Sequence, residues 1–238
     1  MTVWKSTKPL EEGARYVRKY LYLAMAAASV AVLAAPIAAS ATDAKASPAV
    51  LTISKAGGTA VRTKATLQTS LATGTSAVFS TSLFNLTCKS LSFSATVTKN
   101  PKAKGTAAES VTKQSVSKCT VSFPGVTVKS VTVDNLPYNA TVSDAKGDPV
   151  TVSATKKNKP VETTVSVALG KTLYTCIYSI TTLKGSASNK GNTISFSKQK
   201  FTSVKGSASL CPATATFAAT LGPVKDSSVR HSPSVFVN

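Results

Sequence analysis

Two Ser-x-x-Lys motifs are the first candidates for chemistry in this chain. They run from Ser110 to Lys113 and from Ser195 to Lys198. In penicillin-recognising enzymes this spacing works because a helix turn brings the serine nucleophile and the lysine to one side. The residues around both motifs favour β-structure, in which positions three apart face opposite ways. The Ser-Asp-Asn and Lys-Thr-Gly motifs that accompany the enzyme motif do not occur here, so both matches are interpreted as chance or repeat structure.

The other catalytic candidates are also incomplete. Gly170-Lys171-Thr172 resembles the end of a phosphate-binding loop, but the required earlier glycine is replaced by Val165. His231 is the only histidine and sits in a polar tail; a Ser-His-acid triad built on it stays open as an alternative. The acids after residue 42 follow no calcium-loop spacing: Asp43, Glu109, Asp134, Asp144, Asp148, Glu162 and Asp226. We therefore expect no catalytic, cofactor-binding or metal-binding residues and no enzyme activity.

The four cysteines predict two disulfides. Cys88, Cys119, Cys176 and Cys211 have no C-x-x-C spacing, which makes zinc ligation or a reactive thiol the weaker alternative. In an exported chain, cysteines are oxidised to disulfides. Three connectivities are possible, and we expect Cys88–Cys119 and Cys176–Cys211 because this pairing gives each half of an internal repeat its own bridge.

The N-terminal segment predicts export. An uncharged run, 21–39, follows Arg15, Arg18 and Lys19 and precedes a small-x-small triplet, which predicts a signal peptide over 1–41 cleaved between Ala41 and Thr42. The alternative is an uncleaved membrane anchor. Lys19 replaces the second arginine of a twin-arginine signal, so we expect the general secretory route and a secreted or cell-wall-associated product. Translation starting at Val17 instead of Met1 would also give a conventional signal.

The mature chain is strongly basic. Five of the 28 Lys and Arg residues and two of the nine acids fall within 1–41, which leaves a formal charge of +16 on residues 42–238. Only two of these cations are arginines and aromatic residues are few, so a sequence-specific nucleic-acid reader is not expected. The charge allows nonspecific attraction to polyanions such as anionic cell-wall polymers. The interpretation we favour is that the lysines keep strand faces solvated and oppose aggregation.

The pattern of apolar and polar residues predicts an all-β fold. Leu91, Phe93, Ala95 and Val97 alternate with Ser and Thr, which is typical of a half-buried strand. Segments 51–53 and 61–67, separated by a Gly-Gly turn, predict a first hairpin. The remaining turns are closely spaced, and no helical period appears after residue 41. We expect an all-β, antiparallel sandwich or barrel in one secreted domain, 42–238, without a membrane segment after cleavage.

Two matching octets predict an internal repeat. Segments 110–117 and 195–202 both begin with Ser, carry Lys-Gln in the middle and place apolar residues at the second and seventh positions. Together with the similar cysteine spacings, they predict two pseudo-repeated half-units at about 76–143 and 161–221. A single compact body is expected, since each half-unit needs a partner to cover its apolar face.

Several short stretches resemble a group of exported actinobacterial proteins labelled Tat pathway signal sequence domain proteins. The resemblance rests on structural motifs such as Ser94-Ala95-Thr96-Val97-Thr98, Val131-Thr132-Val133-Asp134-Asn135-Leu136-Pro137-Tyr138 and the ending Val235-Phe236-Val237-Asn238. It covers nearly all of the mature chain and implies no activity. The sequence thus favours a non-catalytic surface or secreted protein; a carrier or inhibitor with a small-molecule or protein ligand, and a hydrolase, are the alternatives.

Overall fold

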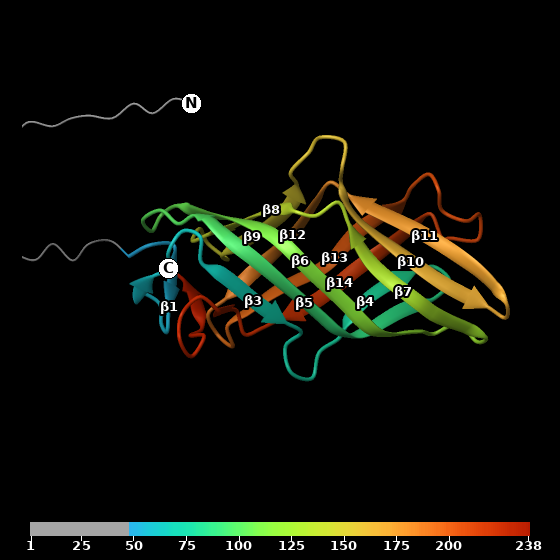
Figure 1. Cartoon of the computed structure of the whole chain (residues 1–238), viewed down its shortest axis with the longest axis horizontal. Helices are drawn as coiled ribbons and strands as arrows, with labels where there is room; N and C mark the ends of the chain where they lie inside the picture. The colour runs from blue at the N-terminus through green and yellow to red at the C-terminus, as the bar shows by residue number, and fades with distance from the viewer. Residues whose placement is uncertain (1–47) are drawn as a thin grey trace, which may run out of the picture. The chain divides into compact units, whose positions relative to one another are not determined.

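Sixteen strands and no helix make up residues 48–238, the part of the chain that the computed structural model describes (Figure 1). The strands are β1 (Leu51–Ile53), β2 (Thr59–Ala60), β3 (Thr66–Ser70), β4 (Ala77–Thr81), β5 (Asn85–Lys99), β6 (Thr106–Val121), β7 (Val126–Asp134), β8 (Tyr138–Ser143), β9 (Pro149–Ala154), β10 (Val161–Leu169), β11 (Thr172–Ile180), β12 (Thr182–Ser188), β13 (Thr193–Ser203), β14 (Thr214–Leu221), β15 (Lys225–Asp226) and β16 (Val235–Val237). All pairings are antiparallel, so the all-β expectation is confirmed. The predicted signal peptide and its cleavage site, Ala41 and Thr42, lie outside the described residues.

Eight strand positions close into a barrel. The order β12-β9-β8-β6-β5-β4-β14-β13 returns to its start because β12 also pairs with β13. Three positions are each filled by two consecutive strands, β7 with β8, β9 with β10 and β11 with β12. The chain therefore runs up and down between neighbouring positions, and β7, β10 and β11 extend the wall beyond β8, β9 and β12. Of the two expected architectures, the structure is the barrel.

Both repeated octets contain a β-bulge. In β6 the register shifts between the pairs Ser94–Lys113 and Ala95–Val111, and in β13 it shifts between Phe196 and Gln199. Bulges bend a strand and increase its twist. The bends come where β6 stops pairing with β8, at Val111, and where β13 changes its partner from β12 to β11. The octets are thus the bending points of two long barrel strands.

The interior of the barrel holds the core. Leu91, Ala95 and Val97 are buried as the alternation predicted. The rings of Phe79 and Tyr178 meet edge to face with centroids 5.1 Å apart, and Phe79 meets Phe201 at 5.3 Å. Such edge-to-face contacts between aromatic rings stabilise a core beyond the area they bury. These aromatic side chains therefore fill the barrel interior at the end where β11 forms part of the wall.

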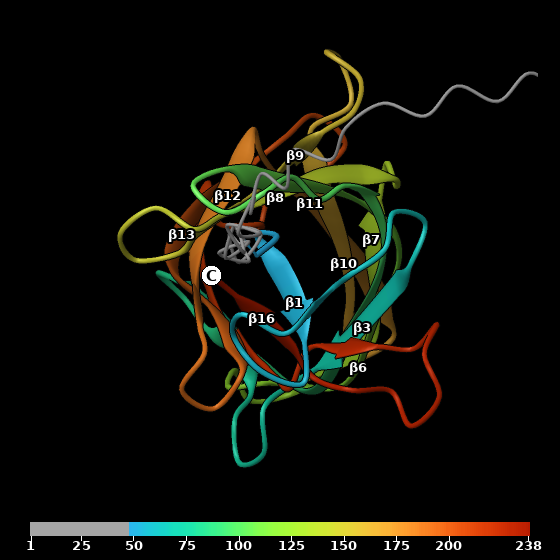
Figure 2. The ribbon, with the colours of Figure 1, turned by 90° about the vertical axis from the view of Figure 1, so that its left-hand side faces the viewer.

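A small sheet of the order β16-β1-β2 lies across the other end of the barrel, as Figure 2 shows. Asparagine side chains fasten it: Asn192 donates to the carbonyl of Val235 and accepts from the amide of Val224 at 2.6 Å, and Asn189 bonds both backbone groups of Val237. The predicted first hairpin is only partly right. Segment 51–53 pairs with Thr59–Ala60, whereas β3 leaves it to pair with β5, because Leu67 is buried in the barrel core instead.

No helix within residues 48–238 is long and apolar enough to cross a membrane.

Candidate functional site

A large concave surface forms a groove on the outside of the barrel, which we name the outer groove. It runs over the outer faces of β3, β5 and β6, which lie side by side in Figure 1, and is bounded by the segment after β14. Its volume is about 920 Å³. The lining residues are Gln68, Thr69, Ser70, Ser92, Phe93, Ser94, Thr112, Lys113, Gln114, Ser115, Leu136, Pro223, Lys225, Ser227 and Ser232.

Hydroxyl and amide side chains dominate the outer groove. Two ammonium groups, those of Lys113 and Lys225, are its only charges, and none of its lining residues is an acid. Phe93 and Leu136 add apolar surface. Hydroxyls and amides donate and accept hydrogen bonds, whereas ammonium groups only donate. The groove therefore suits a ligand that is rich in oxygen acceptors and negatively charged.

Backbone pairing and a side-chain hydrogen bond position Lys113 and Lys225 of the outer groove. The bulge in β6 turns Lys113 outward after Val111 has pointed into the barrel. Lys225 lies in β15, which pairs with Gln68 of β3. The buried Asp226 accepts a hydrogen bond from the Ser228 amide at 2.9 Å and so fixes the turn that follows β15.

The lysine and arginine side chains are more exposed than the acids: Asp226 is buried, and the other five described acids are partly exposed. Six of the 28 Lys and Arg residues precede residue 48, and the other 22 are all exposed. None of the six carboxylates in the described residues is fully exposed. Asp134, for example, accepts a hydrogen bond from Thr164 at 2.7 Å, and Asp144 accepts one from the Lys104 amide. The exposed charge of the described residues is therefore predominantly positive.

One half-buried acid, Glu109, faces the interior of the barrel. Glu109 follows the inward-facing Ala107 and precedes the inward-facing Val111 on β6, and it lines two interior cavities. Burial raises the pKa of its carboxyl group to about 7, because the surroundings solvate the charged form poorly. No hydrogen bond or ion pair to this carboxylate is found among residues 48–238. Glu109 was one of seven acids in the sequence analysis; its phase with Ala107 and Val111 is the signal that marks it as interior.

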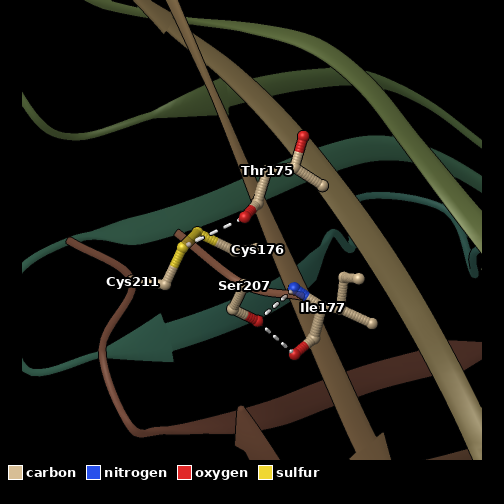
Figure 3. Close-up of a disulfide and its surroundings, with 5 residues drawn as sticks. All are labelled: Thr175, Cys176, Ile177, Ser207 and Cys211. Carbon is tan, nitrogen blue, oxygen red and sulfur yellow. Dashed lines mark hydrogen bonds between the residues drawn. A yellow bond between two sulfur atoms is a disulfide. The ribbon is translucent and has the colours of Figure 1, made fainter. Parts of the chain in front are cut away.

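The cysteines form the two expected disulfides. Cys88 and Cys119 are directly opposite on β5 and β6, and Cys176 of β11 bonds Cys211 in the loop after β13. Figure 3 shows this loop held against β11: the Ser207 hydroxyl bonds the amide and the carbonyl of Ile177 at 2.9 and 3.0 Å. The cysteines thus connect neighbouring parts of the barrel wall, and two disulfides indicate an oxidising, extracellular environment.

The catalytic candidates of the sequence lie apart from one another. The bulge places Ser110 and Lys113 on the same outer face, contrary to the expectation of opposite faces, but only Lys113 lines the outer groove. The Ser195 hydroxyl lies 3.3 Å from that of Thr220, and Gly170-Lys171 forms the tight turn between β10 and β11. His231 is exposed in a turn.

Within residues 48–238, no group of three or more His, Cys, Asp or Glu side chains is arranged to hold a metal ion. No family model, curated protein or solved structure matches the chain. The resemblance to exported actinobacterial proteins stays a prediction.

Proposed function

We propose that this is a non-catalytic exported protein that binds anionic polymers of the cell envelope through the outer groove and the lysines around it. The observation that carries the proposal is the excess of exposed positive charge: the described residues include 22 exposed cations and only six acids, five partly exposed and one buried. A predominantly positive surface attracts polyanions over a Debye length, about 8–10 Å at physiological salt, and releases their counterions on binding.

The groove supplies a place where a polymer could be held in a defined way. Its hydroxyls and amides match the phosphate and hydroxyl oxygens of a polyol-phosphate chain, and its two lysines match the charge. Lysine is a point charge that does not require one fixed geometry of its partner. Such a site favours the class of polymer over a particular sequence of units.

Titration with a purified glycerol-phosphate polymer at several salt concentrations tests the proposal. The Lys113→Ala/Lys225→Ala variant removes the two groove charges, and Lys156→Ala/Lys157→Ala is the matched control in an exposed turn outside the groove. The plot of log affinity against log salt should be steep and linear. For the groove variant, the slope should fall by about 1.4, which is about 0.7 for each lost contact with a flexible polyanion chain.

The control variant should retain most of its affinity and slope. Equal losses in both variants would show that the groove is not the site, and absence of binding at low salt would reject the proposal.

Export through the general secretory route, with cleavage between Ala41 and Thr42, is part of the same proposal. N-terminal sequencing of protein recovered from the medium or the cell wall should begin at Thr42. A retained N-terminal segment would instead support the membrane anchor.

A further inference from the structure

Three apolar cavities follow one another inside the barrel, and we name them the inner chambers. Their volumes are about 40, 60 and 80 Å³. The first and second share Leu67, Glu109 and Val142 in their walls, and the second and third share Phe93 and Phe196. One water needs only about 10–15 Å³ of such volume, so each chamber has room for several non-hydrogen atoms.

Glu109 is the only ionisable side chain in the walls of the inner chambers. The walls come from β3–β10 and β12–β14 and, at one end, from β1 and β16, and every other lining side chain is apolar or neutral. A carboxylate in such surroundings is costly unless a partner compensates its charge. Within residues 48–238 the protein offers no such partner. The chambers thus combine apolar space with one uncompensated negative group.

The third chamber lies close to the outer groove, near the place where the β6–β8 ladder ends. The ladder between β6 and β8 ends at Val111, and β7, which follows along this side, pairs with β10 and not with β6. Phe93 and Gln114, which face each other across β5 and β6, line both the outer groove and the third chamber. These two side chains therefore lie between the outer groove and the third chamber.

We propose that the inner chambers bind a small aliphatic amine, whose ammonium group pairs with the Glu109 carboxylate while its chain occupies the apolar cavities. Charge complementarity selects a cation over a neutral molecule or an anion of the same length. The small chamber volumes, compared with about 300–1,000 Å³ for a drug-sized pocket, select a short unbranched chain. The outer surface, with its exposed lysines, repels the same amine, so binding of an amine points to the interior.

Calorimetric titration of the disulfide-intact protein with n-hexylamine tests this site, with 1-hexanol and hexanoate as ligands of similar size. We expect saturable binding of one hexylamine, weaker binding of 1-hexanol and none of hexanoate. The Glu109→Gln variant keeps the shape of the side chain and removes the charge, so its affinity for hexylamine should fall at least tenfold. Because burial raises the pKa of Glu109 to about 7, hexylamine affinity should increase up to tenfold per pH unit between pH 5 and 7.

A second variant separates loss of charge from loss of space. Ala140 lines the second chamber beside Glu109, so Ala140→Leu should fill the chamber and abolish hexylamine binding while the carboxyl group stays. Amide-resolved NMR should place the hexylamine-induced shifts on β6 and β8 and not on the surface lysines. Absence of hexylamine binding, unchanged binding by Glu109→Gln or Ala140→Leu, or equal binding of hexanoate would each overturn the proposal.

Discussion

The buried carboxyl group of Glu109 makes the stability of the barrel depend on pH. Its pKa is about 7 in the folded protein, against 4.5 for an unperturbed glutamic acid. Below pH 4.5 the group is protonated in both states and has no effect. Between pH 4.5 and 7 the unfolded chain loses the proton first, so the free energy of unfolding falls as pH rises, and above pH 7 the loss is complete. At 1.36 kcal/mol per pKa unit, the full loss is about 3 kcal/mol.

Chemical denaturation of the wild type and Glu109→Gln from pH 4.5 to 8 measures this effect. The variant cannot ionise, so the two proteins should be of similar stability at pH 4.5, and the variant should become more stable by about 3 kcal/mol at pH 8. In thermal unfolding this corresponds to about 6–12 °C for a domain of this size. The raised pKa of Asp148, in a surface turn, cancels in the difference, since both proteins contain this residue. Parallel pH profiles would refute the assignment of Glu109 as a buried, uncompensated acid.

Three further predictions concern the barrel itself. Tyr178 and Tyr138 are equally buried, but the Tyr178 hydroxyl has no hydrogen-bond partner in the described structure, whereas that of Tyr138 accepts from the Glu162 amide and donates to a backbone carbonyl. Tyr178→Phe should therefore leave the free energy of unfolding unchanged or raise it by about 1 kcal/mol, and Tyr138→Phe should lower it by about 1–3 kcal/mol; equal effects in denaturant titrations would contradict this reasoning. Asn192→Ala should speed amide exchange in β16 before it affects the barrel strands, and uniform acceleration would show that the end sheet does not open separately. Replacing Cys176 and Cys211 by alanine, which opens a loop with a sequence separation of 35, should lower the free energy of unfolding by about 3–4 kcal/mol, and an unchanged denaturation midpoint would contradict a stabilising role.

Local patterns were sufficient to predict much of the wall of the barrel. Alternation from Leu91 to Val97 predicted a half-buried strand because side chains of a strand alternate between its faces. The cysteine spacings and the repeated octets predicted the two disulfides. The alternation is a property of neighbouring residues and the disulfide pairing follows from the repeat, and the structure confirms both.

Closure of the barrel and its consequences were not predictable in the same way. The choice between sandwich and barrel depends on the bulges in β6 and β13 and on pairing between β14 and β4, which are far apart in the sequence. The outer groove needs Lys225 to lie beside Gln68, a contact fixed by β15. Counting acids could not show that all six in the described residues avoid full exposure. Those properties arise from register and curvature, which composition does not encode.

The most direct measurement of the central claim, that the outer groove binds polyanions, is NMR mapping of the isotope-labelled mature protein with the glycerol-phosphate polymer. The account predicts saturable shifts at the amides of Lys113, Gln114 and Lys225 and their neighbours in β3 and β5, with smaller effects at the loop lysines. Shifts spread evenly over all exposed lysines, or no shifts at low salt, would contradict it.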